Sequence, residues 1–347
     1  MSSLIPKSTG SVRPRIAVEV RPEGVYAARA DDDAGLLTQI ASAALPAGAL
    51  VPSLRVGNVV DRIAVIAALK KTLSAVQVDK SRDVTLIVPD TSVRVLLLDF
   101  DELPSKLDEA LPVLRFRLAK LLPFPPDQAQ VSYQVMSRYA QVLQVLVVAI
   151  PNEVLAEYES AVREAGFEPG AVLPSTLAVA SAIDDAAQAA TLLVNASEFA
   201  ATTAILRRGE LLLHRTLELK SSGMAEAAAG VALEPANAAI HAEFGDASEV
   251  AVAEMVQASV LSDAAEADRA ALELLQAISV AAAYFEDSLS VAPTEVLTAG
   301  TLSASALGEM VRESGMEARD VLTSSDLLAG SSIPRGLLAG LRGALKI

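Results

Sequence analysis

The sequence predicts an α/β fold built from two related lobes, and three observations support this prediction. A β-hairpin pattern opens the chain at residues 16–29 and recurs at residues 192–214, as internal duplication would produce. Strand and helix patterns alternate after each hairpin, and residues from about 99–167 have the order of a small α+β domain. The length of 347 residues also favours about two domains over one core.

The first lobe is expected at residues 15–190. Strand patterns at 15–20 and 25–29 flank Gly24, whose freedom at positive φ suits a turn. A helix at 62–73 follows, and a buried strand at 84–88 stops before a proline. The apolar residues that we expect on one face of that helix are Ile63, Ile66, Leu69 and Leu73.

The insertion within this lobe is expected to start after a strand at 93–98. Leucines from Leu107 to Leu121 recur at spacings of three and four, which predicts a helix with one apolar stripe. Pro112 lies inside it and should bend the helix or move its start. The elements expected next are strands at 131–135 and 142–150, and a helix at 152–165.

The second lobe is expected at residues 191–329, where the hairpin pattern restarts. It should hold a long helix ending near Leu289 and a later strand, helix and strand. The strands expected here are 192–194, 201–206, 211–217 and 295–298.

Composition limits the kinds of partner. The formal charge of −15 disfavours nucleic acids and anionic membrane surfaces, because both repel an acidic protein. No run approaches the ~20 apolar residues of a membrane span, and the sequence has no Cys and only two His, far apart. Residues 1–14 predict a disordered leader without the apolar core of a signal peptide, so a cytoplasmic location is expected.

The last segment, residues 330–347, predicts a basic amphipathic tail. Its leucines fall at helical spacing, and its cations are Arg335, Arg342 and Lys346. Such a segment suits contact with an anionic membrane surface, or docking back onto the acidic body of the protein. Both interpretations stay open on the sequence alone.

Two hairpin-led halves with a small domain inserted in the first describe the architecture of actin-like ATPases, with their ribonuclease H-like core. Four motifs in the insertion narrow the resemblance by their order: Leu103-Pro104, Leu122-Pro123-Phe124, the run from Val145 to Glu153, and the run from Ala165 to Pro169. In this order they resemble the PilM family of type IV pilus assembly proteins, over about residues 15–328.

The resemblance implies a four-subdomain relative of the cell-division protein FtsA. It implies a cytoplasmic protein, peripheral to the inner membrane, that binds ATP and the N-terminal peptide of the inner-membrane protein PilN. Pilus platform and motor proteins would then be further partners. Leu121, Leu122, Pro123 and Phe124 are candidates for peptide capture, although a helix stop with an aromatic plug is the commoner role for a run such as Leu122-Pro123-Phe124.

All four nucleotide motifs of the family are altered in this chain. Where the family has Asp-Ile-Gly-Ser in the first hairpin, this chain has Glu19, Val20, Arg21 and Pro22; in the second, Asp-Ile-Gly meets Asn195, Ala196 and Ser197. The family's Glu-Ile-Arg-Arg meets the run from Ala277 to Val280, and its Ser-Gly-Gly turn keeps only Gly300. The remnant cleft positions are therefore Glu19, Arg21, Asn195, Ser197 and Gly300.

These replacements predict a scaffold without catalytic residues and without a resident cofactor or metal. Carboxylates would repel a triphosphate, and Asn195 carries no charge to hold a metal-bound water. Arg21 could offset that repulsion, so weak anion binding stays open. ATP with Mg enters only through the resemblance. Two alternatives remain: an active actin-like ATPase with an unusual nucleotide site, and a cytoplasmic component of a type II secretion platform.

Overall fold

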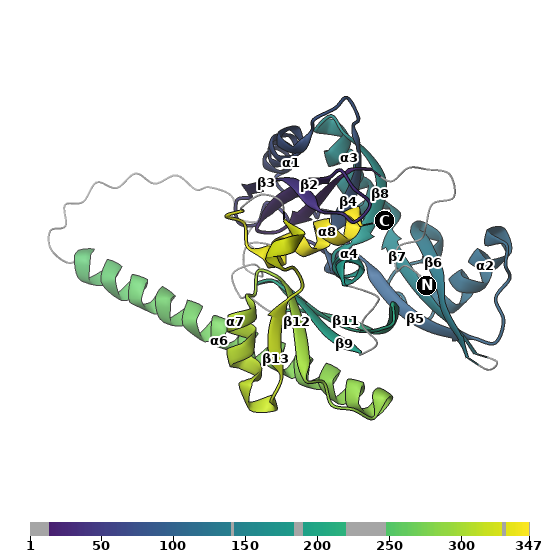
Figure 1. Cartoon of the computed structure of the whole chain (residues 1–347). Helices are drawn as coiled ribbons and strands as arrows, with labels where there is room; N and C mark the ends of the chain where they lie inside the picture. The colour runs from purple at the N-terminus through teal and green to yellow at the C-terminus, as the bar shows by residue number, and fades with distance from the viewer. Residues whose placement is uncertain (1–13, 140–141, 184–189, 220–247, 328–330, 347) are drawn as a thin grey trace.

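The structure is a computed structural model, and it describes residues 14–139, 142–183, 190–219, 248–327 and 331–346. Two five-stranded sheets form two lobes, and a three-stranded sheet stands beside the first (Figure 1). The predicted leader, apart from Pro14, lies outside the described residues. The two-lobed α/β architecture predicted from the hairpin repeat is confirmed.

The first-lobe sheet has the strand order β3-β2-β1-β4-β8. Its strands are β1 (Ile16–Arg21), β2 (Gly24–Ala30), β3 (Leu37–Ala44), β4 (Asp83–Val88) and β8 (Glu168–Pro174). Arg21 pairs with Gly24, so only Pro22 and Glu23 form the hairpin turn. Every residue of β1 and β2 is buried, because α1 (Arg62–Val76) and a C-terminal helix both contact these strands.

The second-lobe sheet repeats this order as β11-β10-β9-β12-β13. Its strands are β9 (Thr191–Ala196), β10 (Ala200–Arg207), β11 (Glu210–Glu218), β12 (Glu295–Gly300) and β13 (Glu317–Asp320). In each sheet, the strand that comes first in the sequence (β1 or β9) pairs antiparallel with the next strand in the sequence (β2 or β10). It pairs parallel with the fourth strand in the sequence (β4 or β12). The sequence-based prediction of an internal duplication therefore agrees with the topology.

Helices occupy matching places in the two lobes. α1 and α6 (Ser248–Leu289) each precede the fourth strand of their sheet, and α3 (Asn152–Glu164) and α7 (Ala304–Val311) each precede the fifth. After the fifth strand come α4 (Ser175–Ala182) in the first lobe and α8 (Ala339–Leu345) in the second. Short 3-10 turns are η1 (Asp90–Ser92), η2 (Pro126–Gln128), η3 (Arg312–Ser314), η4 (Ser324–Asp326) and η5 (Arg335–Leu338).

The C-terminal segment is part of the core between the lobes. α8 packs against α4 and against β1, β2 and β4, and it runs between the two lobes in Figure 1. Its leucines are at most 5% exposed: Leu337, Leu338, Leu341 and Leu345. The expectation of a separate tail at residues 330–347 with an apolar face for lipid is therefore wrong, and the docking alternative is confirmed. The tail completes the second repeat by crossing back to the first lobe.

The insertion is a small sheet with one covering helix. β5 (Arg94–Phe100), β6 (Ala129–Tyr139) and β7 (Val142–Pro151) have the order β5-β7-β6, and α2 (Leu107–Leu118) packs on one face. α3 belongs elsewhere, because Val154 and Tyr158 lie in the core of the first lobe. The structure therefore places the insertion at about residues 94–151 and corrects the expected limits of 99–167.

Two predicted helix faces are rotated from their expected positions. Ile63 is 84% exposed because α1 begins at Arg62, where Asp61 caps it by accepting from Ala64 N, and the buried face starts one turn later at Val65. In α2 the buried positions are Ala110, Leu114 and Leu118, whereas Leu107 and Leu121 are exposed. Pro112 lies inside α2 without ending it.

Candidate functional site

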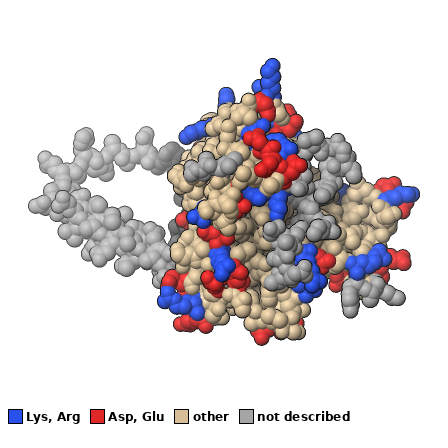
Figure 2. All heavy atoms as spheres, in the orientation of Figure 1, with Lys and Arg blue, Asp and Glu red and all other residues tan. Residues whose placement is uncertain are grey.

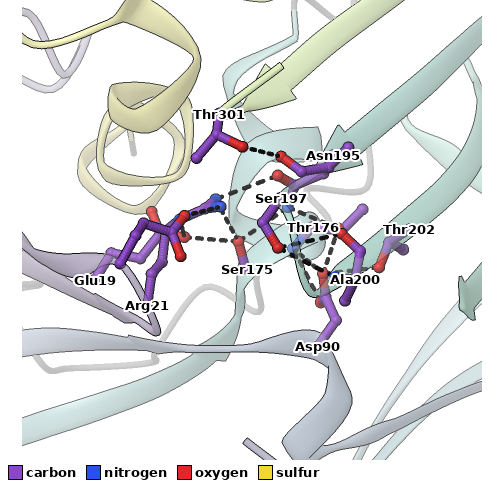
Figure 3. Close-up of polar contacts among 12 residues, drawn as sticks. Glu19, Arg21, Asp90, Ser175, Thr176, Asn195, Ser197, Ala200, Thr202 and Thr301 are labelled. Atoms are coloured by element: carbon purple, nitrogen blue, oxygen red, sulfur yellow. Dashed lines mark hydrogen bonds and ion pairs between the residues drawn. The ribbon is translucent and has the colours of Figure 1, made fainter. Parts of the chain in front are cut away.

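The side chain of Arg21 joins the two related hairpins. Arg21 ends β1 in the first lobe and Asn195 is the penultimate residue of β9 in the second. Arg21 Nη2 donates to Asn195 Oδ1 at 3.2 Å and to Ser175 Oγ at 3.1 Å, and its Nε donates to Glu19 Oε1 at 2.8 Å. Figure 3 shows the guanidinium between Glu19 and Asn195. The three residues that the sequence singled out are thus brought together.

The carboxylate of Glu19 needs this cation. Glu19 is completely buried, and besides Arg21 its Oε1 accepts from Ser175 Oγ at 2.7 Å. Burial tends to lower the pKa of Arg21, but the neighbouring carboxylates, Glu19 first among them, raise the pKa overall and keep the guanidinium charged. A buried ion pair becomes strongly destabilising when one partner is lost, because the other charge remains unpaired. Glu19 and Arg21 therefore act as one unit.

A second polar cluster surrounds Asp90, immediately behind the first. Asp90 accepts from Thr176 N at 3.1 Å, from Thr176 Oγ1 at 2.5 Å and from Thr202 Oγ1 at 3.1 Å. Asn195 Nδ2 donates to Thr176 Oγ1 and to Ser175 Oγ, both at 3.0 Å, and so connects the two clusters. Asp90, in the first lobe, thus holds Thr202 of the second lobe directly.

His214 on β11 lies against the same carboxylate, with its Nε2 4.0 Å from Asp90 Oδ1. Burial is the larger influence and lowers the pKa of His214, while Asp90 partly opposes that effect. The imidazole is therefore neutral at neutral pH. No described residue forms a hydrogen bond with its Nε2.

The remaining two remnant positions have roles in the local fold. Ser197 Oγ accepts from Phe199 N at 3.3 Å and from Ala200 N at 3.2 Å, so it caps the turn between β9 and β10. Gly300 has φ +89°, and a Cβ there would overlap the carbonyl of Ala196. Thr301 N donates to that carbonyl at 2.9 Å, which shows why the chain must pass so close. Only glycine fits this position.

These side chains do not fit a magnesium–triphosphate complex. Such a site needs short turn residues whose N–H groups meet the phosphates, and acidic oxygens that hold the metal's water. Here the guanidinium of Arg21 lies between the two hairpins. The side-chain amide of Asn195 forms hydrogen bonds with Arg21 and with two hydroxyl groups, and Ser197 Oγ accepts a hydrogen bond from its own turn. Within the described residues, no group of three or more His, Cys, Asp or Glu could hold a metal ion.

A cavity of about 530 Å³ remains in the cleft beside Arg21. Residues 50–53 of the first lobe line one side, and Phe199 and Leu219 of the second lobe line another. Glu23, Asp90 and Arg269 also border it. The cleft has therefore kept a space for a small molecule, although its polar wall differs from that of a phosphate site.

A second groove, of about 300 Å³, lies between β8 and the small sheet. One face of the small sheet packs on α2 through Val145 and Val147, and the opposite face lines the groove through Leu146 and Val148. The side of β8 turned away from β4 has no partner strand among the described residues. No charged side chain is among the described residues that line the groove.

The four candidates for peptide capture lie outside this groove. Leu122 and Phe124 pack against the core under α2, while Leu121 and Pro123 are exposed. The aromatic-plug interpretation of the motif is therefore confirmed. A part for it in peptide binding stays a prediction.

The sequence analysis missed Asp90, Ser175 and Thr176, although a signal was present. These residues directly follow a proline at the carboxyl end of a strand: Asp90 follows Pro89 after β4, and Ser175 and Thr176 follow Pro174, the last residue of β8. Because β4 and β8 are parallel neighbours, their carboxyl ends meet at one edge of the sheet. Thr202 and His214 carried no such signal, since they sit within strands whose burial depends on the other lobe.

Charge is dispersed on the surface. Figure 2 shows Lys and Arg interspersed with Asp and Glu over the visible face, without one continuous basic area. No helix among the described residues is long and apolar enough to cross a membrane. The expectation that nucleic acid is not a partner remains a prediction from the net charge.

Comparison with solved structures matches the chain to the PilM-PilN type IV pilus biogenesis complex. The TM-score is 0.65 at 19% identity, over 88% of this chain and 88% of the matched chain. The fold is actin-like. The resemblance found in the sequence thus holds at the level of fold.

Two further structures are similar at lower scores. The cytoplasmic domain of EpsL, an inner-membrane component of the type II secretion system of Vibrio cholerae, gives a TM-score of 0.38 at 11% identity, over 62% of this chain and 75% of that one. The ethanolamine utilization protein EutJ from Carboxydothermus hydrogenoformans gives 0.47 at 11% identity, over 97% and 91%. No family model and no curated protein matches the sequence.

Proposed function

We propose that this protein is an actin-like scaffold of a type IV pilus machine that binds the N-terminal peptide of a PilN-like inner-membrane protein and does not hydrolyse ATP. The observation that carries the proposal is the uncharged groove beside β8, in a fold similar to a structure solved as a PilM-PilN complex. Binding such a partner would hold the protein at the cytoplasmic side of the inner membrane, near platform and motor proteins of the pilus.

The groove has the features of a strand-addition site. β8 is the last strand of its sheet, so part of its backbone N–H and C=O groups lacks a partner strand, and an extended peptide can pair with such an edge. Leu146, Val148 and Ile150 form an apolar floor under the position such a peptide would take. An uncharged, apolar peptide segment therefore suits the groove better than an acidic or basic one.

The absence of hydrolysis is proposed from the cleft. A triphosphate would have to displace Arg21 from Glu19, leaving that fully buried carboxylate unpaired next to the phosphates. The alternative of an active ATPase with substitute residues requires a group that activates water. Asp90 borders the cleft, but two threonines hold its carboxylate, and His214 is buried beside it, so neither side chain is placed to activate a water molecule.

Peptide binding can be tested by fluorescence anisotropy with the N-terminal peptide of a PilN-like single-span membrane protein from the same organism. Ser132 lies on the groove face of β6 and is exposed, so Ser132→Arg should fill the groove without unfolding the protein. We expect the variant to lose about 10-fold or more in affinity. The matched control is Ser105→Arg, in the exposed loop before α2, which should bind as the unmodified protein does.

Leu121→Ala decides between the two candidate sites. Unchanged affinity in that variant supports the groove, whereas a loss confined to Leu121→Ala would move peptide capture to the turn after α2. Failure of the unmodified protein to bind the peptide, together with intact surface fibres after gene deletion, would remove the pilus assignment.

A further inference from the structure

The turn of the first hairpin places the weakly paired carboxylate of Glu23 at the wall of the interlobe cavity. Neither oxygen of Glu23 accepts a hydrogen bond from another described residue, although both are shielded from bulk solvent. The nearest cation atom is Arg21 Nη1, 3.9 Å from Glu23 Oε1, beyond hydrogen-bond distance. Arg21 directs its Nε and Nη2 to Glu19, Ser175 and Asn195. Apart from its own backbone N–H and the 3.9 Å ion pair with Arg21, the part-buried Glu23 carboxylate has no donor among the described residues.

Other acids make the same region of the wall electronegative. Asp90 and Glu218 also line the cavity, and Glu19 lies directly behind Arg21. The cations that line the same cavity are Arg21, which is hydrogen-bonded to Glu19, and Arg269 of α6. Burial raises the pKa of Glu23 while Arg21 opposes that effect, which reflects a carboxylate short of compensating partners. An anionic ligand would add to this excess of negative charge.

The rest of the cavity is apolar and comes from both lobes. Leu50, Val51 and Pro52 contribute from the first lobe, and Phe199 and Leu219 contribute from the second. The volume of about 530 Å³ is in the range of sites that enclose small ligands. Apolar walls with one convergent charged group favour a ligand with an apolar body and one charged end.

We propose that this cavity binds a small cationic ligand, with an amine, amidine or guanidine group on the Glu23 carboxylate and an apolar body between the two lobes. The site takes the place of the nucleotide site of the fold but selects the opposite charge. Because such a ligand touches both lobes, it would stabilise their closed arrangement. This inference goes beyond the proposed function and does not depend on the pilus assignment.

The test uses three probes of one shape and different charge: benzamidine as cation, benzamide as neutral analogue and benzoate as anion. Isothermal titration calorimetry should show binding of benzamidine, weaker binding of benzamide and no measurable binding of benzoate. A hydrogen bond to a charged group is worth about 1.5–3 kcal/mol, so Glu23→Gln should weaken benzamidine binding by about 10- to 100-fold. That variant also removes a buried charge, so it should fold.

Glu102→Gln is the matched control, because Glu102 is exposed in the loop before α2 and does not line the cavity. It should bind benzamidine as the unmodified protein does. The proposal is overturned if benzoate binds as tightly as benzamidine, if neither amidine nor amide binds, or if Glu23→Gln leaves the affinity for benzamidine unchanged.

Discussion

At the scale of single residues, Arg21 is the feature on which the proposed loss of nucleotide binding rests. Its guanidinium is a cation that is covalently part of the chain and so cannot leave the cleft. Hydrogen bonds to Glu19, Ser175 and Asn195 hold it between the two hairpins. The family resemblance implied that Asn195 stands at the acidic position of the second hairpin. It did not show where Arg21 would point, because a turn arginine is compatible with solvent, with phosphate or with a partner in the other lobe.

The ion pair makes a quantitative prediction. Arg21→Met should leave Glu19 as an unpaired buried charge and lower the free energy of unfolding by about 3–5 kcal/mol. The double variant Glu19→Gln with Arg21→Met removes both charges and should recover most of that loss. Urea denaturation followed by circular dichroism measures both.

Arg62→Met provides the control. Because Arg62 pairs with the exposed Glu164, this substitution should lower the free energy of unfolding far less. If Arg21→Met were as mild as this control, the guanidinium would not be the group that holds the cleft together.

At the scale of secondary-structure elements, α8 depends on glycines at its contacts. A Cβ on Gly340 would lie 2.7 Å from Glu19 Oε2, and one on Gly336 of η5 would lie 2.5 Å from the carbonyl oxygen of Gly300. On Gly343 it would overlap the backbone of Ala178 in α4. The helix can therefore approach both lobes only because these positions lack side chains.

The same substitution should have opposite effects at two helical glycines. Gly343→Ala should lower the free energy of unfolding by about 1–3 kcal/mol, because the added methyl group collides with α4. Gly308→Ala in α7, where a Cβ would make only an ordinary contact with Ala318 at 3.7 Å, should raise it by about 0.5–1 kcal/mol through helix propensity. Thermal melts of the two variants give the comparison, and equal effects would contradict the packing described for α8.

The elements that the sequence predicted well are those with strong local patterns. Both hairpins, the strands of the small sheet and α3 were all expected, since alternation, turn residues and helical spacing act locally. β3 was missed because its half-buried residues do not alternate clearly. The places of α3 and α8 were misjudged because an apolar helix face does not reveal which surface will cover it.

At the scale of the whole molecule, contacts among the described residues join the two repeats, and three of them stand out. Arg21 meets Asn195, Asp90 meets Thr202, and α8 returns from the second lobe to pack on α4. A hinge between lobes would have to break these buried polar contacts, which is costly where no water replaces them. The duplication was visible in the sequence. The contacts between the lobes were not, because each of them requires one residue from each lobe.

This arrangement leads to the central claim, that contacts between the lobes have replaced the nucleotide site. Calorimetric titration of the full chain with Mg-ATP tests it most directly, with the PilN-like peptide as a check that the same sample is active in binding. The account predicts no measurable heat of binding up to about 1 mM nucleotide. A dissociation constant in the micromolar range that is lost in Asn195→Ala would contradict it.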